Sequence, residues 1–453
     1  MRYVSLASVM SVLICLSGQG RADDSLSHSA NGWTFSGPRE EVLPKSEFLK
    51  DGGPEKSGCL RIQSDDRAGL HGWWQRTVPI TGGQTYHFSV LRRTANVESP
   101  RQAAVARVFW QDQKGAAAIH DFKAQTTYRE GERPQSEPEY PSDGDQQESG
   151  WTEVSGTFRA PSNATQARIE LSFRWPANAT LDWANVRLDR IATPPDRIIR
   201  LATVHFAPAA GTTNAEKCRQ FEPLIQRAAE QKADLIVLPE TLTYFNSRRS
   251  MSDCAEPIPG ESTDYFGTLA KKHDLYIVAG LLERDQHQVF NVAVLIGPDG
   301  KVVGKYRKVA LPRTEIDAGV VAGDDYPVFE TRFGKVGMMV CYDGFYPEVA
   351  RELSNRGAEV IAFPVWGCNP LLASARACEN HVFVVSSTYT DVKANWMITA
   401  VFGRDGRPLA KAENWGDVVV TEVNLSQPAI WHSLGDFRAE VLRHRPLVKP
   451  AVP

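Results

Sequence analysis

The chain has 453 residues, of which 42% are hydrophobic and 23% charged, a composition typical of a soluble globular protein. Its length favours two domains over a single core. The formal net charge of −3 gives no reason to expect a nucleic-acid partner or an anionic membrane surface. The ten histidines show no metal-ligand spacing and no C-x-x-C occurs, so we expect no structural metal site.

The first 22 residues have the pattern of a signal peptide for export. Arg2 precedes an apolar run at 4–16, and Gly20 and Ala22 supply the small residues of a cleavage site. The run is too short and too rich in serine to span a bilayer, and no other apolar stretch approaches membrane length. We therefore expect a secreted or periplasmic protein that begins at Asp23 and has no membrane span.

Six cysteines remain after this signal, at positions 59, 218, 254, 341, 368 and 378. Outside the cytoplasm an even number of cysteines favours disulfides. Cys218 with Cys254 is one candidate pair, although the sequence does not assign connectivity.

Residues 23–192 have the pattern of an all-β domain. Stretches with an apolar residue at every second position recur at regular spacing and are joined by Gly, Pro and Asn, as in β-sandwiches and jelly rolls. We expect strands at 73–78, 86–91, 105–110, 151–158, 167–175 and 180–188. The polar stretch 121–150 is expected to form a long surface loop.

Three motifs of this region, at 86–89, 151–158 and 181–186, resemble the galactose-binding-like jelly rolls that serve as carbohydrate-binding modules. The resemblance implies a glycan contact through the N-terminal domain. An exposed Trp73 or Trp110 could stack on a sugar ring, but packing in the sandwich core is the favoured interpretation for both.

After a proline-marked linker at 192–196, residues 198–425 show buried strands alternating with helices. This pattern indicates a sheet-on-sheet α/β sandwich, and the lack of any glycine-rich phosphate-binding motif argues against nucleotide use. Residues 426–453 are expected to form a C-terminal tail. We expect strands at 198–206, 234–238, 275–282, 359–365, 382–389 and 418–423, helices at 214–232 (capped by Asn214), 262–273, 348–356 and 370–380, and hairpins at 289–308, 328–340 and around 405–406.

Three side chains of different chemistry follow strand ends of this second domain. Glu240 follows an apolar strand, Lys308 ends the first hairpin, and Cys341 follows the buried run 336–340 just ahead of a helix. Each one alone has an ordinary interpretation, as a loop glutamate, a solvated lysine or a small buried thiol. Together they supply a nucleophile, a base and a cation for the charge that develops on a substrate, which is the minimum set for covalent acyl transfer.

The same three residues lie in motifs that resemble those of the nitrilase (carbon–nitrogen hydrolase) superfamily. The motifs are Leu-Ile-Val-Leu-Pro-Glu at 235–240, Gly-Lys-Tyr-Arg-Lys at 304–308 and Gly-Met-Met-Val-Cys-Tyr-Asp at 337–343. The resemblance covers residues 198 to about 425 and implies a four-layer αββα sandwich. Members usually pair into dimers, so a homodimer is an open option here. Glu315 falls where the family often has a second glutamate beside the substrate.

The resemblance also implies a mechanism that needs no metal or organic cofactor. Glu240 would take the thiol proton while Cys341 attacks the substrate carbon, and Lys308 with the backbone N–H of Tyr342 would hold the oxyanion. Water would then cleave a thioester. A tyrosine after the cysteine favours an amide or N-carbamoyl substrate, and Tyr244 and Trp366 could shape the small-molecule pocket.

Other interpretations use the same residues. Nitrile hydrolysis and N-acyl transfer are the alternatives within enzymes, and the second is disfavoured because membrane spans are missing. A catalytically dead carbohydrate-binding or scaffold protein is the alternative outside enzymes, and intact Glu240, Lys308 and Cys341 argue against it.

Overall fold

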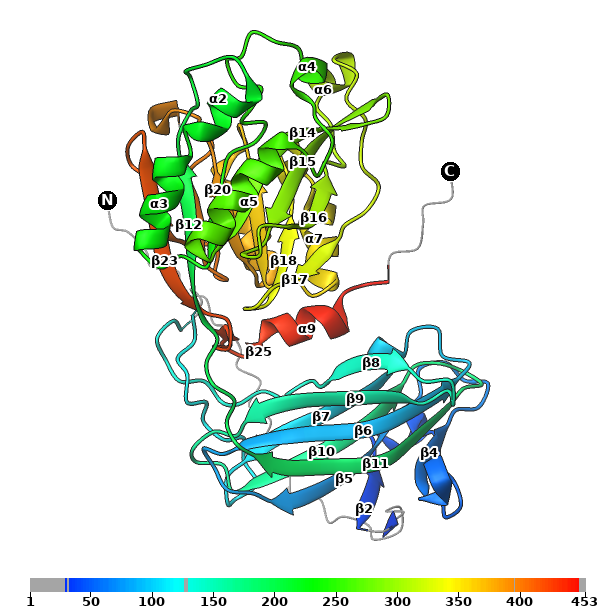
Figure 1. Ribbon diagram of the computed structural model, residues 1–453. Helices are drawn as coiled ribbons and strands as arrows, with labels where there is room; N and C mark the ends of the chain where they lie inside the picture. The colour runs from blue at the N-terminus through cyan, green and yellow to red at the C-terminus, as the bar shows by residue number, and fades with distance from the viewer. Residues whose placement is uncertain (1–28, 31, 126–128, 395, 448–453) are drawn as a thin grey trace, which may run out of the picture.

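The computed structural model describes residues 29–30, 32–125, 129–394 and 396–447. The expected signal peptide, residues 1–22, lies outside the described residues. Within the described part, no helix combines the length and the apolar character that a bilayer crossing needs. The chain forms an N-terminal β-domain and a C-terminal α/β domain, with the last helix between them (Figure 1).

The N-terminal domain consists of two antiparallel sheets, as expected for an all-β region. Large apolar side chains, among them Trp74, Trp183 and Phe88, fill the space between the sheets. Trp110 is 1% exposed and belongs to this core, so it is not available to a sugar, whereas Trp73 is half-buried. In sheet order the strands are β1 (Ser29–Ala30), β2 (Trp33–Ser36), β5 (His71–Pro79), β10 (Gln166–Arg174) and β7 (Ala104–Gln111), and β3 (Lys45–Leu49), β4 (Cys59–Gln63), β11 (Thr180–Ile191), β6 (Thr85–Ala95), β9 (Thr152–Arg159) and β8 (Ser142–Gln146).

The expectation that 121–150 is a plain surface loop is wrong. Strand β8 lies within it and extends the six-stranded sheet by pairing with β9. Ala124 and Tyr140 are buried. The segment also contacts the second domain, since the backbone N–H of Gln125 donates to the carbonyl of Ile430 and Glu130 pairs with Arg407. Its polar composition hid these contacts, because they depend on residues about 280 positions later in the chain.

The second domain has two mixed sheets packed face to face. Parallel strands form the centre of each sheet, and antiparallel strands form the edges. In sheet order they are β16 (Val302–Arg307), β15 (Gln288–Ile296), β14 (Tyr276–Asp285), β13 (Leu235–Val237), β12 (Ile198–His205) and β23 (Asp417–Asn424), and β17 (Val328–Glu330), β18 (Lys335–Met338), β19 (Val360–Pro364), β20 (Phe383–Ser387), β21 (Ala400–Phe402) and β22 (Pro408–Lys411).

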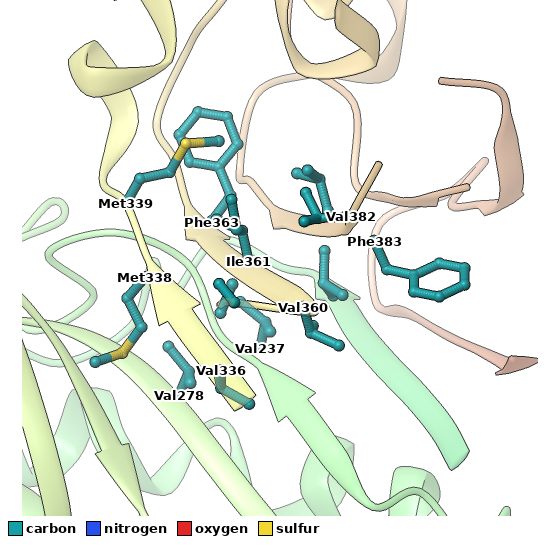
Figure 2. Close-up of a cluster of buried hydrophobic side chains, with 14 of the residues drawn as sticks. Val237, Val278, Val336, Met338, Met339, Val360, Ile361, Phe363, Val382 and Phe383 are labelled. Carbon is teal, nitrogen blue, oxygen red and sulfur yellow. The ribbon is translucent and has the colours of Figure 1, made fainter. Parts of the chain in front are cut away.

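Alternating residues of the central strands divide between two apolar cores. Val237 and Val278 point toward Val336 of the other sheet (Figure 2). Their sequence neighbours Ile236 and Ile277 pack instead with the outer helices of the first sheet. Helices α2 (Asn214–Arg219), α3 (Glu222–Glu230) and α5 (Glu261–His273) cover that side, and α7 (Pro347–Asn355) and α8 (Pro370–Asn380) cover the second sheet. The layers are therefore αββα, as expected.

Three details differ from the sequence-based expectations. The single helix expected at 214–232 is two helices, because Pro223 starts a new first turn where its missing N–H is tolerated. Thr213, not Asn214, caps α2 by accepting the N–H of Glu216. All cysteines of the described residues are free thiols, so the Cys218–Cys254 disulfide is not formed.

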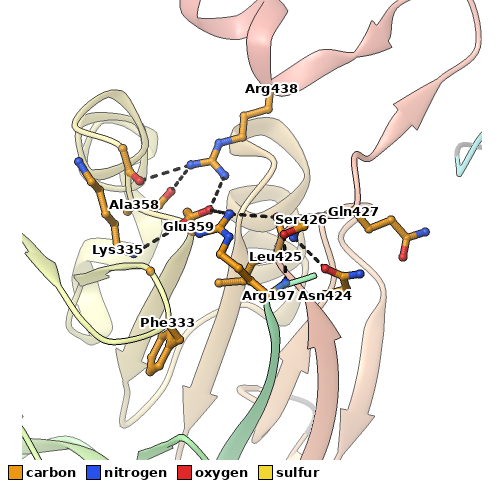
Figure 3. A network of polar contacts seen from close by, with 12 residues as sticks. Arg197, Phe333, Lys335, Ala358, Glu359, Asn424, Leu425, Ser426, Gln427 and Arg438 are labelled. Atoms are coloured by element: carbon orange, nitrogen blue, oxygen red, sulfur yellow. Dashed lines mark hydrogen bonds and ion pairs between the residues drawn. The ribbon is translucent and has the colours of Figure 1, made fainter. Parts of the chain in front are cut away.

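The C-terminal segment is not a simple tail. After β24 (Ile430–Trp431) and β25 (Gly435–Asp436), α9 (Phe437–His444) lies between the domains (Figure 1). Arg438 donates to the carbonyls of Gly357 and Ala358 and lies 3.7 Å from Glu359, which in turn pairs with Arg197 of the linker (Figure 3). The other end of α9 contacts the β-domain, where Arg443 pairs with Asp143 at 2.7 Å.

The remaining short elements are η1 (Glu40–Val42), η2 (Pro54–Lys56), α1 (Pro100–Ala103), α4 (Met251–Cys254), α6 (Arg313–Asp317), η3 (Cys341–Phe345) and η4 (Val392–Ala394).

A partly buried carboxyl beside this junction makes the stability of the fold depend on pH. Burial raises the pKa of Glu139 to about 7, and the charge of Asp436 raises it further. A hydrogen bond from Trp110 acts in the opposite direction and lowers the pKa. The fold therefore favours the protonated acid, and this stabilisation is lost as the pH rises through about 7.

We expect Glu139→Gln to match the wild type in urea unfolding at pH 5. At pH 8 the variant should be more stable, on the order of 2 kcal/mol, because an amide cannot ionise. The exposed Glu153→Gln is the control and should follow the wild type at both pH values. Equal stability of Glu139→Gln and wild type at pH 8 would contradict the assignment.

Candidate active site

Cys341, the candidate nucleophile, lies in a tight turn shortly after β18. Cys341 is the first residue of η3 and has φ of +44°, a left-handed conformation that is costly for a residue other than glycine. The carboxylate of Asp343 holds this turn by accepting the N–H of Val340 at 2.9 Å and the N–H of Ala310 at 2.9 Å. The hydroxyl of Tyr306 also donates to it, at 2.8 Å. Through these hydrogen bonds, Asp343 connects the turn at Cys341 to the segment that follows β16.

Burial raises the pKa of Asp343 to about 6, although the two backbone hydrogen bonds oppose the change. The next residue, Gly344, lies so close to the Phe363 ring that an added Cβ would be 2.6 Å from it. The turn therefore requires the buried carboxylate of Asp343 as a hydrogen-bond acceptor, and it requires glycine at position 344 because a side chain would not fit there.

Lys308 lies beneath the cavity and is bonded to two carboxylates. Its Nζ is 3.0 Å from Oε1 of Glu240 and 2.6 Å from Oε1 of Glu315, and its side chain is completely buried. Asn291 of β15 donates its Nδ2 to Glu240 at 2.8 Å and to Glu315 at 3.3 Å. The other oxygen of Glu240 accepts the N–H of Trp366 at 2.8 Å. Glu240 is therefore fixed on three sides.

These charges set the protonation of the site. Burial alone would lower the pKa of Lys308, but the charges of Glu240 and Glu315 outweigh burial and raise the pKa, so the amine stays cationic. Burial first, and then the Glu240 charge, raise the pKa of the Cys341 thiol against the effect of Lys308. The thiol is consequently protonated at rest, and it donates to the carbonyl of Gly367 at 3.4 Å. Attack by sulfur then requires a base, and Glu240 is the neighbouring group that can serve.

A cavity of about 370 Å³ opens over these groups. Glu240, Glu315 and Cys341 line it, together with Tyr342, Tyr244 and Trp366, so every sequence-predicted site residue except the buried Lys308 contacts the cavity. Among the described residues, no three His, Cys, Asp or Glu side chains gather in the way a metal ion would require.

Several residues of the site escaped the sequence analysis. Asn291 is a polar residue inside the apolar strand β15, and that interruption was a usable signal. Tyr389, Phe245 and Trp396 also line the cavity, but they come from segments that carry no motif. Burial raises the pKa of Tyr389 and the charge of Glu240 adds to the effect, so the Tyr389 hydroxyl lies close enough to feel the same carboxylate.

A comparison with protein-family models matches residues 201–432 to the model described as "Carbon-nitrogen hydrolase". The chain belongs to the carbon-nitrogen hydrolase family. It is accordingly an enzyme with a cysteine nucleophile, and its nitrilase-like α/β domain follows an all-β region that lies outside the match. The galactose-binding-like identity of that β-domain stays a prediction, as does a homodimer.

Two curated relatives show how far the similarity extends. A protein named "Nitrilase" from Pyrococcus abyssi is 40% identical over 173 residues, which are 37% of this chain and 66% of the relative. Omega-amidase NIT2-B from Xenopus laevis is 30% identical over 251 residues, which are 50% of this chain and 88% of the relative.

Solved structures of the same family align with half of the chain. The amidase from Nesterenkonia sp. AN1, solved in complex with acrylamide, is 22% identical and has a TM-score of 0.45, covering 51% of this chain and 93% of its own. Nit3 from Saccharomyces cerevisiae is 23% identical and has a TM-score of 0.45. The alignment covers 56% of this chain and 96% of the Nit3 chain.

The position of Asn291 leads to a test of how Glu240 is held. We expect Asn291→Leu to lower kcat/KM roughly 10- to 100-fold, because a buried carboxylate loses a donor while the shape of the side chain is kept. Asn355→Leu, on α7 and outside the cavity, is the control and should leave kcat/KM unchanged. An unchanged kcat/KM in Asn291→Leu would show that the amide does not position Glu240.

Proposed function

We propose that the protein hydrolyses the carbon–nitrogen bond of a carboxamide or N-carbamoyl group through a thioester on Cys341. The observation that carries the proposal is that Glu240 and Cys341 line one cavity while the buried Lys308 is bonded to Glu240. They come from three separate strand ends, yet Glu240 is bonded to Lys308 at 3.0 Å and both charges act on the thiol.

In the first half of the reaction, Glu240 takes the S–H proton as Sγ of Cys341 bonds to the carbonyl carbon. The carbonyl oxygen becomes an oxyanion, which the Lys308 ammonium and the backbone N–H of Tyr342 stabilise. The protonated Glu240 then gives its proton to the leaving nitrogen as the C–N bond breaks. Ammonia or an amine departs, and the acyl group stays on sulfur.

In the second half, water replaces the departed amine beside Glu240. The carboxylate takes a proton from this water, whose oxygen attacks the thioester carbon. The C–S bond then breaks, Glu240 returns the proton to the departing sulfur of Cys341, and the carboxylic acid leaves. Glu315 keeps Lys308 in place at 2.6 Å and partly neutralises its charge. The step uses only groups that this chain provides.

The curated relatives favour amides. Omega-amidases are among them, at about 30% identity and over most of their own length. A relative named nitrilase keeps nitriles as a second candidate class, since the same thiol could attack a nitrile carbon.

An ammonia-release screen tests the proposal directly. Acrylamide and butyramide are the first substrates, because the Nesterenkonia amidase has been solved with each of them, and N-carbamoyl compounds and nitriles complete the panel. We expect hydrolysis of amides by the wild type and a loss on the order of 10³-fold or more in Cys341→Ala. Cys378→Ala removes a thiol outside the cavity and should keep full activity.

Iodoacetamide labelling separates this enzyme from a catalytically dead scaffold. Mass spectrometry should find Cys341 alkylated in the wild type and more slowly alkylated in Glu240→Gln, because a protonated thiol needs the carboxylate as base. A thiol that is inert in both proteins, or an amidase rate that survives Cys341→Ala, would reject the proposal.

We also propose that the protein is exported, on the pattern of residues 1–22 alone. Expression of the full chain in a bacterium with a secretion pathway should give a periplasmic or secreted product whose N-terminal residue is Asp23. A product that retains Met1 in the cytoplasm would reject export. A glycan contact through the β-domain stays a prediction, and the burial of Trp110 leaves Trp73 as its remaining candidate.

A further inference from the structure

The cavity beside Cys341 is lined largely by aromatic rings. Tyr342, Phe345 and Trp396 form a continuous series, with ring centroids 5.3 Å apart for the first pair and 6.1 Å for the second. Phe245 and Tyr389 form another pair, 4.4 Å apart. All five side chains line the cavity. Rings at these distances make a stiff apolar surface that can stack on a flat ligand group.

Two tryptophans of the lining remain open to solvent. Trp366 is 57% exposed and Trp396 is 39% exposed, so a large part of each indole is uncovered at the cavity. The Trp396 ring lies against Gly367, where an added Cβ would be only 2.0 Å from the indole nitrogen. The carbonyl of Gly367 is also the acceptor of the Cys341 thiol. The glycine thus brings an exposed indole next to the nucleophile, where it can reach the acyl group of a substrate.

Among the residues that the structure describes, the lining offers no cation to a negatively charged substrate. Its charged side chains are Glu240 and Glu315, both acidic. Lys308 is completely buried and already bonded to both of them. Arg313 lies between two lining residues, but its side chain is 86% exposed and is 3.7 Å from Asp317. A second carboxylate on the substrate would therefore lose water beside two acids without gaining a partner, which is costly.

We propose that the acyl group of the substrate is uncharged and apolar, with an aromatic ring that stacks on Trp396 and Trp366, and that monoamides of dicarboxylic acids are rejected. The inference rests on the proposed amide hydrolysis and specifies its substrate class. The cavity volume of about 370 Å³ agrees with it, since such a space suits a ring-bearing ligand better than an amide of a few atoms.

A matched pair of substrates tests the charge rule in the wild-type enzyme. 5-Methylhexanamide and glutaramate have the same number of non-hydrogen atoms and differ in an isopropyl or a carboxylate end. We expect kcat/KM for ammonia release to be at least about 100-fold higher for the neutral amide. Equal or better hydrolysis of glutaramate would overturn the proposal, and no variant needs to fold for this result.

The ring rule is tested with phenylacetamide against acetamide. In Trp396→Ala and Trp366→Ala, the ratio of KM for phenylacetamide to KM for acetamide should rise roughly fivefold to tenfold, because only the ring uses the indoles. Trp415→Ala, which removes an exposed tryptophan outside the cavity, should change neither value. An equal loss on both substrates would show a structural role for the indoles and overturn the ring rule.

The substrate preference and the amide hydrolysis itself can be rejected by different results. Hydrolysis of acetamide without any preference for phenylacetamide or for 5-methylhexanamide would reject this inference alone. The absence of ammonia release from every amide, in a folded wild-type enzyme, would reject the proposed function and the substrate class together.

Discussion

The ion cluster of Lys308, Glu240 and Glu315 is the constraint on which the site depends. A fully buried ammonium is strongly unfavourable unless carboxylates neutralise it, and here two of them lie at 3.0 Å and 2.6 Å. Removal of Lys308 would leave two buried carboxylates without their cation, and removal of both carboxylates would leave the ammonium unpaired. The cluster therefore joins the segment at Glu240 to the segment 308–315, which begins 68 residues later in the sequence.

This arrangement explains how a neutral thiol can serve as nucleophile. Burial and the Glu240 charge keep the proton on Cys341 until a substrate arrives, which protects the sulfur from unproductive reaction. The left-handed turn at Cys341 is held by Asp343, whose carboxylate is satisfied by three donors. The strain of the turn is thus balanced by a buried hydrogen-bond network beside the ion cluster, and both depend on the close packing of the two sheets (Figure 2).

The β-domain is attached to the hydrolase domain through polar contacts as well as through the linker. Helix α9 binds the hydrolase domain through Arg438 and the β-domain through Arg443, and Glu359 joins Arg438 to Arg197 of the linker (Figure 3). Charged pairs that are partly shielded from water hold their geometry better than exposed ones. The two domains therefore have a defined contact, although the proposed catalytic groups all come from one of them.

The sequence by itself predicted an all-β region followed by an α/β domain, and it singled out Glu240, Lys308 and Cys341 as candidate site residues, which the structure brings close together. It could do so because apolar periodicity fixes which face of a strand is buried, and because these residues follow strand ends inside short motifs. Three elements were not foreseen. The break at Pro223 has a local signal in the proline itself, whereas β8 is exposed at every position and so has no apolar alternation. Helix α9 depends on contacts with both domains, which local pattern does not contain.

Only the tertiary structure decided that Asn291 joins the two glutamates, that the six cysteines of the described residues stay free, and that aromatic rings line the cavity. The physical reason is distance along the chain. Phe245, Tyr342 and Trp396 each look like ordinary apolar residues in their own segments, and their shared role exists only because the packing of two sheets brings the loops at their edges together.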